Sequence, residues 1–396
     1  MALRALLNNW ITFISGPLLL AITPGKLMTI FMKNHHRYST FPLCGWALLL
    51  LLFTGCSLAW ACADNFRPST PSTSSHSPVS ITNFGPALKK FLAQASGKPF
   101  KEQLRIWDEV IEKDHQNYFA KLVWEKDANP NWQDDKELTL KYYFQQILGE
   151  FGKDVLRELE SFDPKVQANI QKFLTFFPDA KLPQNIYAGP ALTFTGKAAH
   201  AGDVMGFGID LITKLNLDIN VIFAHEIFHI HHHRAAQIDK YFPQSMNELP
   251  LAFLWKEGLA TYVSQVLNEE APLAEILTSE DLAKVSEEGL YWLASKFLAD
   301  ISWPLNDFDK ITDKWFSAYQ TPAQQAQQDG FPVRSGYLLG YRVMQMIAYY
   351  TEYSMAELAH LNYFQIRNEL IRVLTTLAQQ YPHREKPKNF YTEPQK

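Results

Sequence analysis

The spacing of apolar residues predicts a series of helices after residue 84. Segments 100–124 and 136–162 carry apolar residues at intervals of three and four, which is typical of amphipathic helices. Asp163-Pro164 and Phe177-Pro178 are expected to mark helix boundaries, because proline disfavours the helical conformation of the residue before it. The pattern therefore predicts a helical N-terminal region over residues 84–183.

The apolar pattern changes after residue 184. Segments 185–196 and 204–212 are short, rich in β-forming residues and interrupted by glycine, so we expect them to form strands of a small sheet. Segment 217–236 returns to helical spacing with Asp218 near its start, and residues 249–380 are mainly helical. The predicted fold class is α+β: a small β-sheet supports one central helix, and the chain is mostly helical elsewhere.

The N-terminal segment has the pattern of an export signal. Residues 42–63 form an uncharged apolar run that follows a basic stretch. Ala61-Cys62-Ala63 ends this run with small residues, as a cleavage site does, so we interpret residues 1–63 as a signal peptide or membrane anchor. The basic stretch favours the cytoplasmic side, so the later residues are expected outside the cytoplasm, either periplasmic, secreted or membrane-anchored.

Two points about this segment stay open. A lipoprotein signal would place a lipid on Cys56 and attach the protein to a membrane, and either Met1 or Met32 is the true start. Residues 64–83 are rich in proline, serine and threonine and are expected to form a solvated linker. At the other end, residues 386–396 are expected to be a polar tail.

The charge balance argues against a nucleic-acid partner. The chain has 37 Lys and Arg against 41 Asp and Glu, and residues 1–63 contain basic residues but no acid. The remainder is therefore acidic, whereas nucleic-acid binding needs clustered Lys and Arg. The 3 cysteines also lie before residue 64, so a metal in the later part must be held by histidines and carboxylates.

The segment His225-Glu226-Ile227-Phe228-His229 lies in a predicted helix directly after the predicted strands. Residues four apart share one face of a helix, so both imidazoles can donate a nitrogen to one Zn²⁺. Glu226 projects beside such a metal and is placed to take a proton from a zinc-activated water. This spacing predicts a zinc site with Glu226 as the general base.

A second motif lies downstream, in the helical segment 251–266, where Glu257 precedes Gly258. HEIFH together with EGLATY resembles the gluzincins, the thermolysin-like zinc metallopeptidases and their aminopeptidase relatives. The resemblance implies that His225, His229 and Glu257 bind the zinc, that residues 184–385 are the catalytic domain, and that the substrate is a peptide or protein. The metzincin pattern is absent, because Ala235 stands where its third histidine is required.

Glu248 is the alternative third ligand, since the interval from His229 to Glu248 is also familiar among gluzincin aminopeptidases. It lies just before Pro250, in a loop or at a helix start. A helix holds ligand geometry better than a loop, so we expect Glu257 to be the ligand. Gly258 is expected to let its helix approach the metal-binding helix closely.

Two further features are expected around this site. The SGYLLGYRVMQM segment resembles the GYxxGY helix of predicted zinc peptidases, and either Tyr337 or Tyr341 is a candidate donor to an oxyanion. Gly206, Phe207 and Gly208 are a candidate edge strand for pairing with a peptide. Packing of the two tyrosines in the core, and a purely structural strand, are the alternatives.

The predicted function is hydrolysis of peptide bonds by a zinc-activated water. Two alternatives stay open: an exported, non-catalytic metal-binding or scaffolding protein, and a zinc hydrolase that acts on a non-peptide amide. Metal storage needs no general base, so the presence of Glu226 between the two histidines favours an enzyme.

Overall fold

The computed structural model describes residues 79–126, 130–198, 202, 204–302, 308–317, 331–383 and 385–392. The predictions for residues 1–63, including the signal or anchor and a lipid on Cys56, lie outside these residues, as does the linker up to residue 78. Among the described helices, none combines the length and the apolar character needed to cross a membrane.

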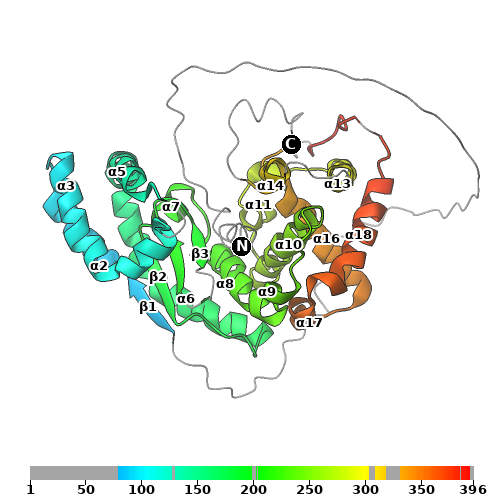
Figure 1. The fold of residues 1–396 in the computed structure, drawn as a ribbon, viewed down its shortest axis with the longest axis horizontal. Helices are drawn as coiled ribbons and strands as arrows, with labels where there is room; N and C mark the ends of the chain where they lie inside the picture. Colours follow the sequence, from blue (N-terminus) through cyan, green and yellow to red (C-terminus); the bar gives the residue numbers. More distant parts are fainter. Residues whose placement is uncertain are drawn as a thin grey trace, which may run out of the picture. The chain divides into compact units, whose positions relative to one another are not determined.

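A four-stranded mixed sheet lies beside helix α8 (Ile219–Ala235), which contains the two histidines (Figure 1). Its strands are β1 (Ser80–Asn83), β2 (Asn185–Gly189), β3 (Gly196–Ala198) and β4 (Val204–Gly208). The spatial order is β1-β2-β4-β3, with β1, β2 and β4 parallel and β3 antiparallel to β4. With helices making up most of the remaining described chain, this confirms the predicted α+β class.

Strand β1 corrects the predicted extent of the linker, which was expected to continue to residue 83. The Asn83 side chain donates to the carbonyl oxygen of Leu159 at 2.7 Å and to Asp163 Oδ1 at 2.8 Å. The next residue, Phe84, is buried. Residues 80–83 lack an apolar alternation because their order comes from pairing with β2 and from these contacts, neither of which a local pattern reveals.

The predicted N-terminal region is helical, and its α-helices alternate with π-helical segments and one 3₁₀ turn. Its α-helices are α2 (Gly85–Ala95), α3 (Phe100–Trp107), α4 (Gln116–Tyr118), α5 (Trp132–Tyr142) and α6 (Gly149–Phe176). Between them lie the π-helical segments η2 (Asp108–Glu112), η4 (Phe119–Val123) and η5 (Tyr143–Leu148), and the 3₁₀ turn η3 (Lys113–His115). The buried carboxylate of Glu112 accepts hydrogen bonds from Trp107 and Trp124.

Helix α6 continues through Asp163-Pro164, so the boundary predicted there is wrong. Proline in a helix interior costs about 3 kcal/mol. Leu159 and Phe162 before the proline and Val166 and Ile170 after it are all buried on one side of the helix, and fully burying each contributes about 1.5–3 kcal/mol. Burial therefore outweighs the break. The boundary predicted at Phe177 is correct, since α6 ends at Phe176.

The second predicted strand ends early, because α7 (Ile209–Lys214) begins directly after Gly208. The buried carboxylate of Asp210 accepts the backbone N–H groups of Ala191 at 3.1 Å and Leu192 at 3.0 Å. These bonds hold the loop after β2 against the start of α7. The next helix, α8 (Ile219–Ala235), begins as predicted, with Asp218 accepting the N–H of Asn220 as its N-cap.

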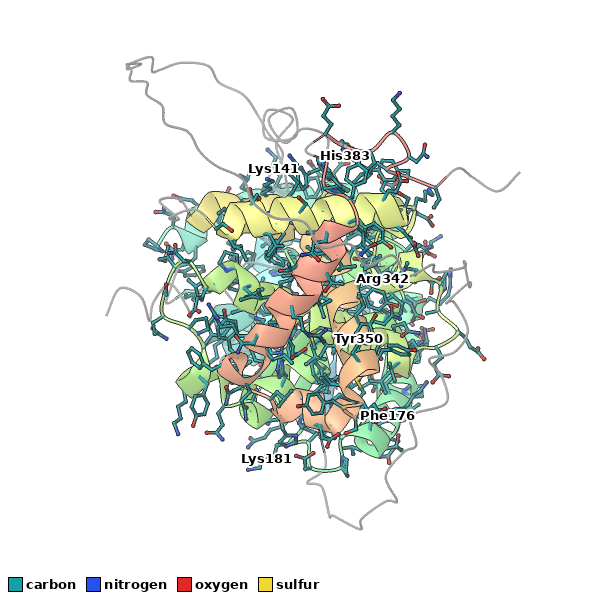
Figure 2. The ribbon with its side chains drawn as sticks, turned by 90° about the vertical axis from the view of Figure 1, so that its right-hand side faces the viewer. Lys141, Phe176, Lys181, Arg342, Tyr350 and His383 are labelled. Carbon is teal, nitrogen blue, oxygen red and sulfur yellow. The ribbon has the colours of Figure 1, made fainter. Side chains whose placement is uncertain are left out.

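The described residues after α8 are mainly helical. They form α9 (Ile238–Tyr241), α10 (Leu249–Leu267), α11 (Leu273–Ile276), α12 (Glu280–Ala283), α13 (Glu287–Ile301), α14 (Phe308–Phe316), α16 (Ser335–Thr351), α17 (Met355–His360) and α18 (Tyr363–Gln379). Helix α10 packs against α8, α16 and α18 and is buried along most of its length. Figure 2 shows α18 and α16 on the face where Arg342 and Tyr350 lie.

Gly258 serves a close helix crossing, but with a different helix from the one expected. A Cβ at Gly258 would lie 2.3 Å from the backbone carbon of Gly340 in α16. A Cβ at Gly340 would lie 2.5 Å from the carbonyl oxygen of Leu254 in α10. The paired glycines therefore let α10 and α16 touch through their backbones. Helix α10 also packs against α8, but the role expected for Gly258 in that approach is wrong.

The polar tail predicted for 386–396 is ordered in its described part. The carbonyl oxygen of Phe390 accepts the N–H of Ser286 at the start of α13, and the Phe390 ring is buried against Trp292. Tyr391 forms a short antiparallel bridge with Val285. The buried ring of Phe390 thus anchors a segment that was predicted to be a polar tail.

Candidate metal centre

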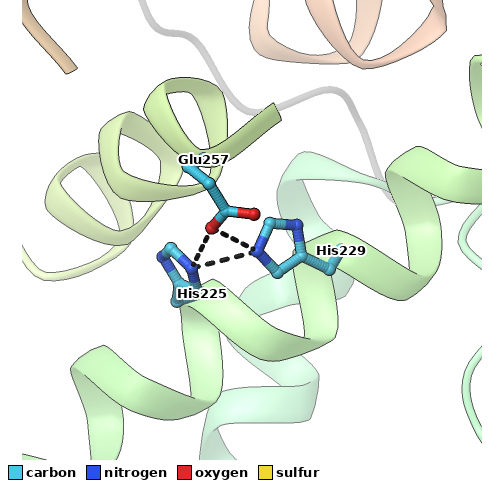
Figure 3. Close-up of side chains that lie close together, drawn as sticks. All are labelled: His225, His229 and Glu257. Atoms are coloured by element: carbon cyan, nitrogen blue, oxygen red, sulfur yellow. Dashed lines mark hydrogen bonds and ion pairs between the residues drawn. The ribbon is translucent and has the colours of Figure 1, made fainter. Parts of the chain in front are cut away.

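His225, His229 and Glu257 converge on one point between α8 and α10 (Figure 3). The two His Nε2 atoms are 3.0 Å apart. Glu257 Oε2 lies 3.3 Å from His225 Nε2 and 3.1 Å from His229 Nε2. Among the described residues this is the one group of three or more His, Cys, Asp or Glu donors close enough to share a metal ion.

These distances fit a shared cation. Ligands at about 2.0–2.1 Å from a tetrahedral Zn²⁺ lie about 3.3 Å from one another. With Glu257 ionised, the three contacts cannot all be hydrogen bonds, because both imidazoles would need a hydrogen on Nε2 to reach the carboxylate and would then repel each other. Two imidazoles and one carboxylate also match the donor set that zinc prefers in open sites.

The protonation states suit metal binding. Burial lowers the pKa of His229 to about 4, so this imidazole is neutral at pH 7 and keeps a free lone pair. Burial alone would raise the pKa of Glu257, but His229 and Lys256 outweigh burial and hold it well below its usual value. Glu257 is therefore ionised despite being fully buried.

Lys256 has a specific position in this arrangement that sequence reasoning missed. Its Nζ lies 3.4 Å from Glu257 Oε1, the oxygen that faces away from the histidines. The contact is an ion pair without hydrogen-bond geometry, since Glu257 Oε1 has no hydrogen-bond partner among the described residues. Lys256 and the two histidines thus take opposite oxygens of one carboxylate, which leaves Glu257 one oxygen for a metal. The adjacent KE pair in the sequence was the available signal.

Glu248 does not belong to this group. It occupies the N-cap position of α10 and accepts a hydrogen bond from Arg367 Nε of α18 at 2.6 Å. Glu257 lies further along the same helix, where Thr261 donates to its carbonyl oxygen at 2.8 Å. The structure therefore groups Glu257, and not Glu248, with the two histidines.

Glu226 lies against the edge strand β3. A Cβ added to Gly196 would be 2.5 Å from Glu226 Cγ and 3.2 Å from Glu226 Oε1. Burial, and then the negative charge of Glu257, raise the pKa of Glu226, while the charges of Lys256 and Arg334 oppose that rise. Gly196 therefore makes room for the Glu226 side chain, a role that no local sequence pattern indicated.

The two candidate tyrosines separate in the structure. The ring of Tyr337 lies 6.1 Å from the ring of His225, nearly parallel to it, and its buried hydroxyl has no hydrogen-bond partner among the described residues. Burial, and then the negative charge of Glu257, raise the pKa of Tyr337 well above its usual value, so it stays a hydrogen-bond donor. Tyr341 instead packs against Tyr262.

The strand that was predicted to pair with a peptide does not lie at the edge of the sheet. Gly206, Phe207 and Gly208 belong to β4, which lies between β2 and β3 and is buried. A Cβ at Gly208 would lie 2.0 Å from the carbonyl oxygen of Phe194, so this glycine allows close packing. The edge strand beside the histidine helix is β3, which contacts α8.

Comparison of the chain with family models, with curated proteins and with solved structures gives no match. The assignment of the site therefore depends on its own geometry and chemistry.

Proposed function

We propose that this protein is a zinc-dependent peptidase whose metal is bound by His225, His229 and Glu257. The observation that carries the proposal is the convergence of their three donor atoms at 3.0–3.3 Å, with the partly buried Glu226 next to the first histidine. Glu226 favours catalysis over storage, because a metal-binding or scaffolding protein does not need a base beside its ligands.

A zinc ion held by these three side chains would supply a Lewis acid and activate water at neutral pH. Glu226 accepts the proton of the attacking water and passes it to the leaving nitrogen. Burial favours this second step, because it raises the pKa of Glu226 and so eases reprotonation. The Tyr337 hydroxyl donates a hydrogen bond to the carbonyl oxygen as negative charge develops there.

An extended peptide is the substrate that the surroundings favour over another amide. Strand β3 pairs with β4 on one side, with Lys197 opposite Gly206, and no described strand pairs with its other side. A peptide can add to such an edge through main-chain hydrogen bonds. Because Gly196 of this strand touches Glu226, a peptide bond paired there would lie beside the general base.

The test compares the wild-type full chain with Glu226→Gln. The amide cannot accept a proton, so we expect the variant to keep about one zinc per chain and lose nearly all hydrolysis of a mixed peptide library. A His225→Ala/His229→Ala double variant is the control and should lose both zinc and hydrolysis. Cleavage by Glu226→Gln at the wild-type rate would refute the proposed role of Glu226.

A further inference from the structure

Arg334 has an unusual backbone at the N-terminal end of α16. Its φ angle is 62°, in the left-handed region that non-glycine residues rarely adopt. Its side chain donates a hydrogen bond to Thr278 Oγ1, and Thr278 is itself left-handed, with φ 49°. Residues held in such strained conformations cluster at active sites and ligand clamps. Arg334 is therefore a candidate for a functional role.

The Arg334 guanidinium contacts the ring of Tyr337, which in turn lies near the proposed metal ligand His225. Its Cζ is 4.1 Å from the centre of the Tyr337 ring, and that ring in turn lies 6.1 Å from the ring of His225. The guanidinium is therefore stacked on the tyrosine assigned to the oxyanion, and that tyrosine adjoins a proposed metal ligand.

This cation lacks a carboxylate partner within the described part of the chain. No ion pair links Arg334 to a described Asp or Glu. Lys256, the other cation at the site, is paired with Glu257 Oε1 at 3.4 Å. A partly buried guanidinium that no described carboxylate neutralises is suited to bind a planar anion through two parallel hydrogen bonds.

We propose that Arg334 binds a carboxylate of the peptide substrate, close to the bond that is cut. The inference rests on the proposed function and adds a substrate class to it: peptides with a negative charge within a residue or two of the scissile bond, since one residue spans about 3.3–3.6 Å. That carboxylate belongs either to the peptide's free C-terminus or to an Asp or Glu side chain.

The experiment uses three pools of N-acetylated tetrapeptides and the full chain loaded with zinc. The first pool has a free C-terminal acid, the second has an amide there, and the third has the amide and one internal Glu. We measure kcat/KM for wild type, Arg334→Gln, Arg334→Lys and Arg342→Gln. The last variant is the matched control, because Arg342 lies on the same helix and bonds Gln345.

We expect wild type to prefer at least one carboxylate pool over the neutral pool by about 10- to 100-fold, as charge-assisted hydrogen bonds provide. Arg334→Gln should remove that preference, so that kcat/KM falls more for the carboxylate pools than for the neutral pool. Arg334→Lys should retain part of it, since the charge remains but the planar fork is lost. Loss confined to the acid pool identifies the C-terminus, and loss confined to the third pool identifies a side chain.

A binding measurement separates failure of this inference from failure of the peptidase. Zinc-loaded Glu226→Gln should be stabilised more by the carboxylate pool than by the neutral pool, seen as a larger rise in Tm, and adding Arg334→Gln should abolish the difference. That result without hydrolysis by wild type would refute the peptidase and keep the carboxylate site. Equal treatment of all pools by wild type, or equal loss for all pools in Arg334→Gln, would overturn the inference.

Discussion

Gly196→Ala tests the relation between the edge strand and the general base. The added Cβ would lie 2.5 Å from Glu226 Cγ and 3.0 Å from Glu226 Cδ, whereas ordinary contacts are 3.4–4 Å. The Glu226 side chain must therefore move by about 1 Å, and a misplacement of that size costs about 10²-fold in rate, or roughly 2.7 kcal/mol in the barrier. Because the end of the Glu226 side chain is flexible, we expect Gly196→Ala to lower the free energy of unfolding by only about 1 kcal/mol.

The assay measures kcat/KM on a peptide pool, zinc per chain and urea unfolding on the same preparation. We expect Gly196→Ala to keep its zinc, because the three ligands belong to α8 and α10. Gly152→Ala is the matched control, since its added Cβ would meet its nearest neighbour at an ordinary 3.8 Å. Wild-type turnover in Gly196→Ala, or loss of zinc together with turnover, would refute the reasoning.

Three further predictions address the ligand, the helix crossing and a buried acid. Glu257→Ala should lower zinc affinity by orders of magnitude and Glu248→Ala by a few-fold at most, and a zinc titration showing the reverse order would move the site. Gly258→Ala should destabilise the fold by about 3 kcal/mol in urea unfolding, because its Cβ would lie 2.3 Å from Gly340, and a change below about 0.5 kcal/mol would contradict the crossing. Burial raises the pKa of Asp210 from 3.8 to about 6, so the folded state binds the extra proton, and wild type should lose stability relative to Asp210→Asn as pH rises from about 4 to about 6. This loss is on the order of 2–3 kcal/mol. It is measured on metal-free protein, and parallel pH profiles of stability for wild type and Asp210→Asn would contradict the prediction.

The parts of the site that were predictable from sequence are those encoded within one helix. The four-residue spacing of His225 and His229, the N-cap at Asp218 and the helical pattern around Glu257 are all local. Helical spacing also placed Tyr337 among the candidates, although it could not separate Tyr337 from Tyr341, because that choice depends on how α16 packs beside α8.

The misplaced features depend on contacts between distant segments. The order β1-β2-β4-β3 puts β4 inside the sheet, and nothing within the Gly206–Gly208 segment reports its neighbours. The partner of Gly258 is Gly340, a distant position in the chain. The strain at Arg334 likewise becomes visible only with its partner Thr278. Local patterns predict elements, but they do not predict which elements meet.

The most direct test of the central claim combines metal content and hydrolysis on one sample. The purified full chain is assayed for zinc and for cleavage of a random peptide library, then treated with a chelator and finally resupplied with zinc. We predict about one zinc per chain, hydrolysis that disappears with the metal, and recovery when zinc returns. Hydrolysis that survives complete removal of the metal, or stoichiometric zinc in the His225→Ala/His229→Ala double variant, would contradict the account.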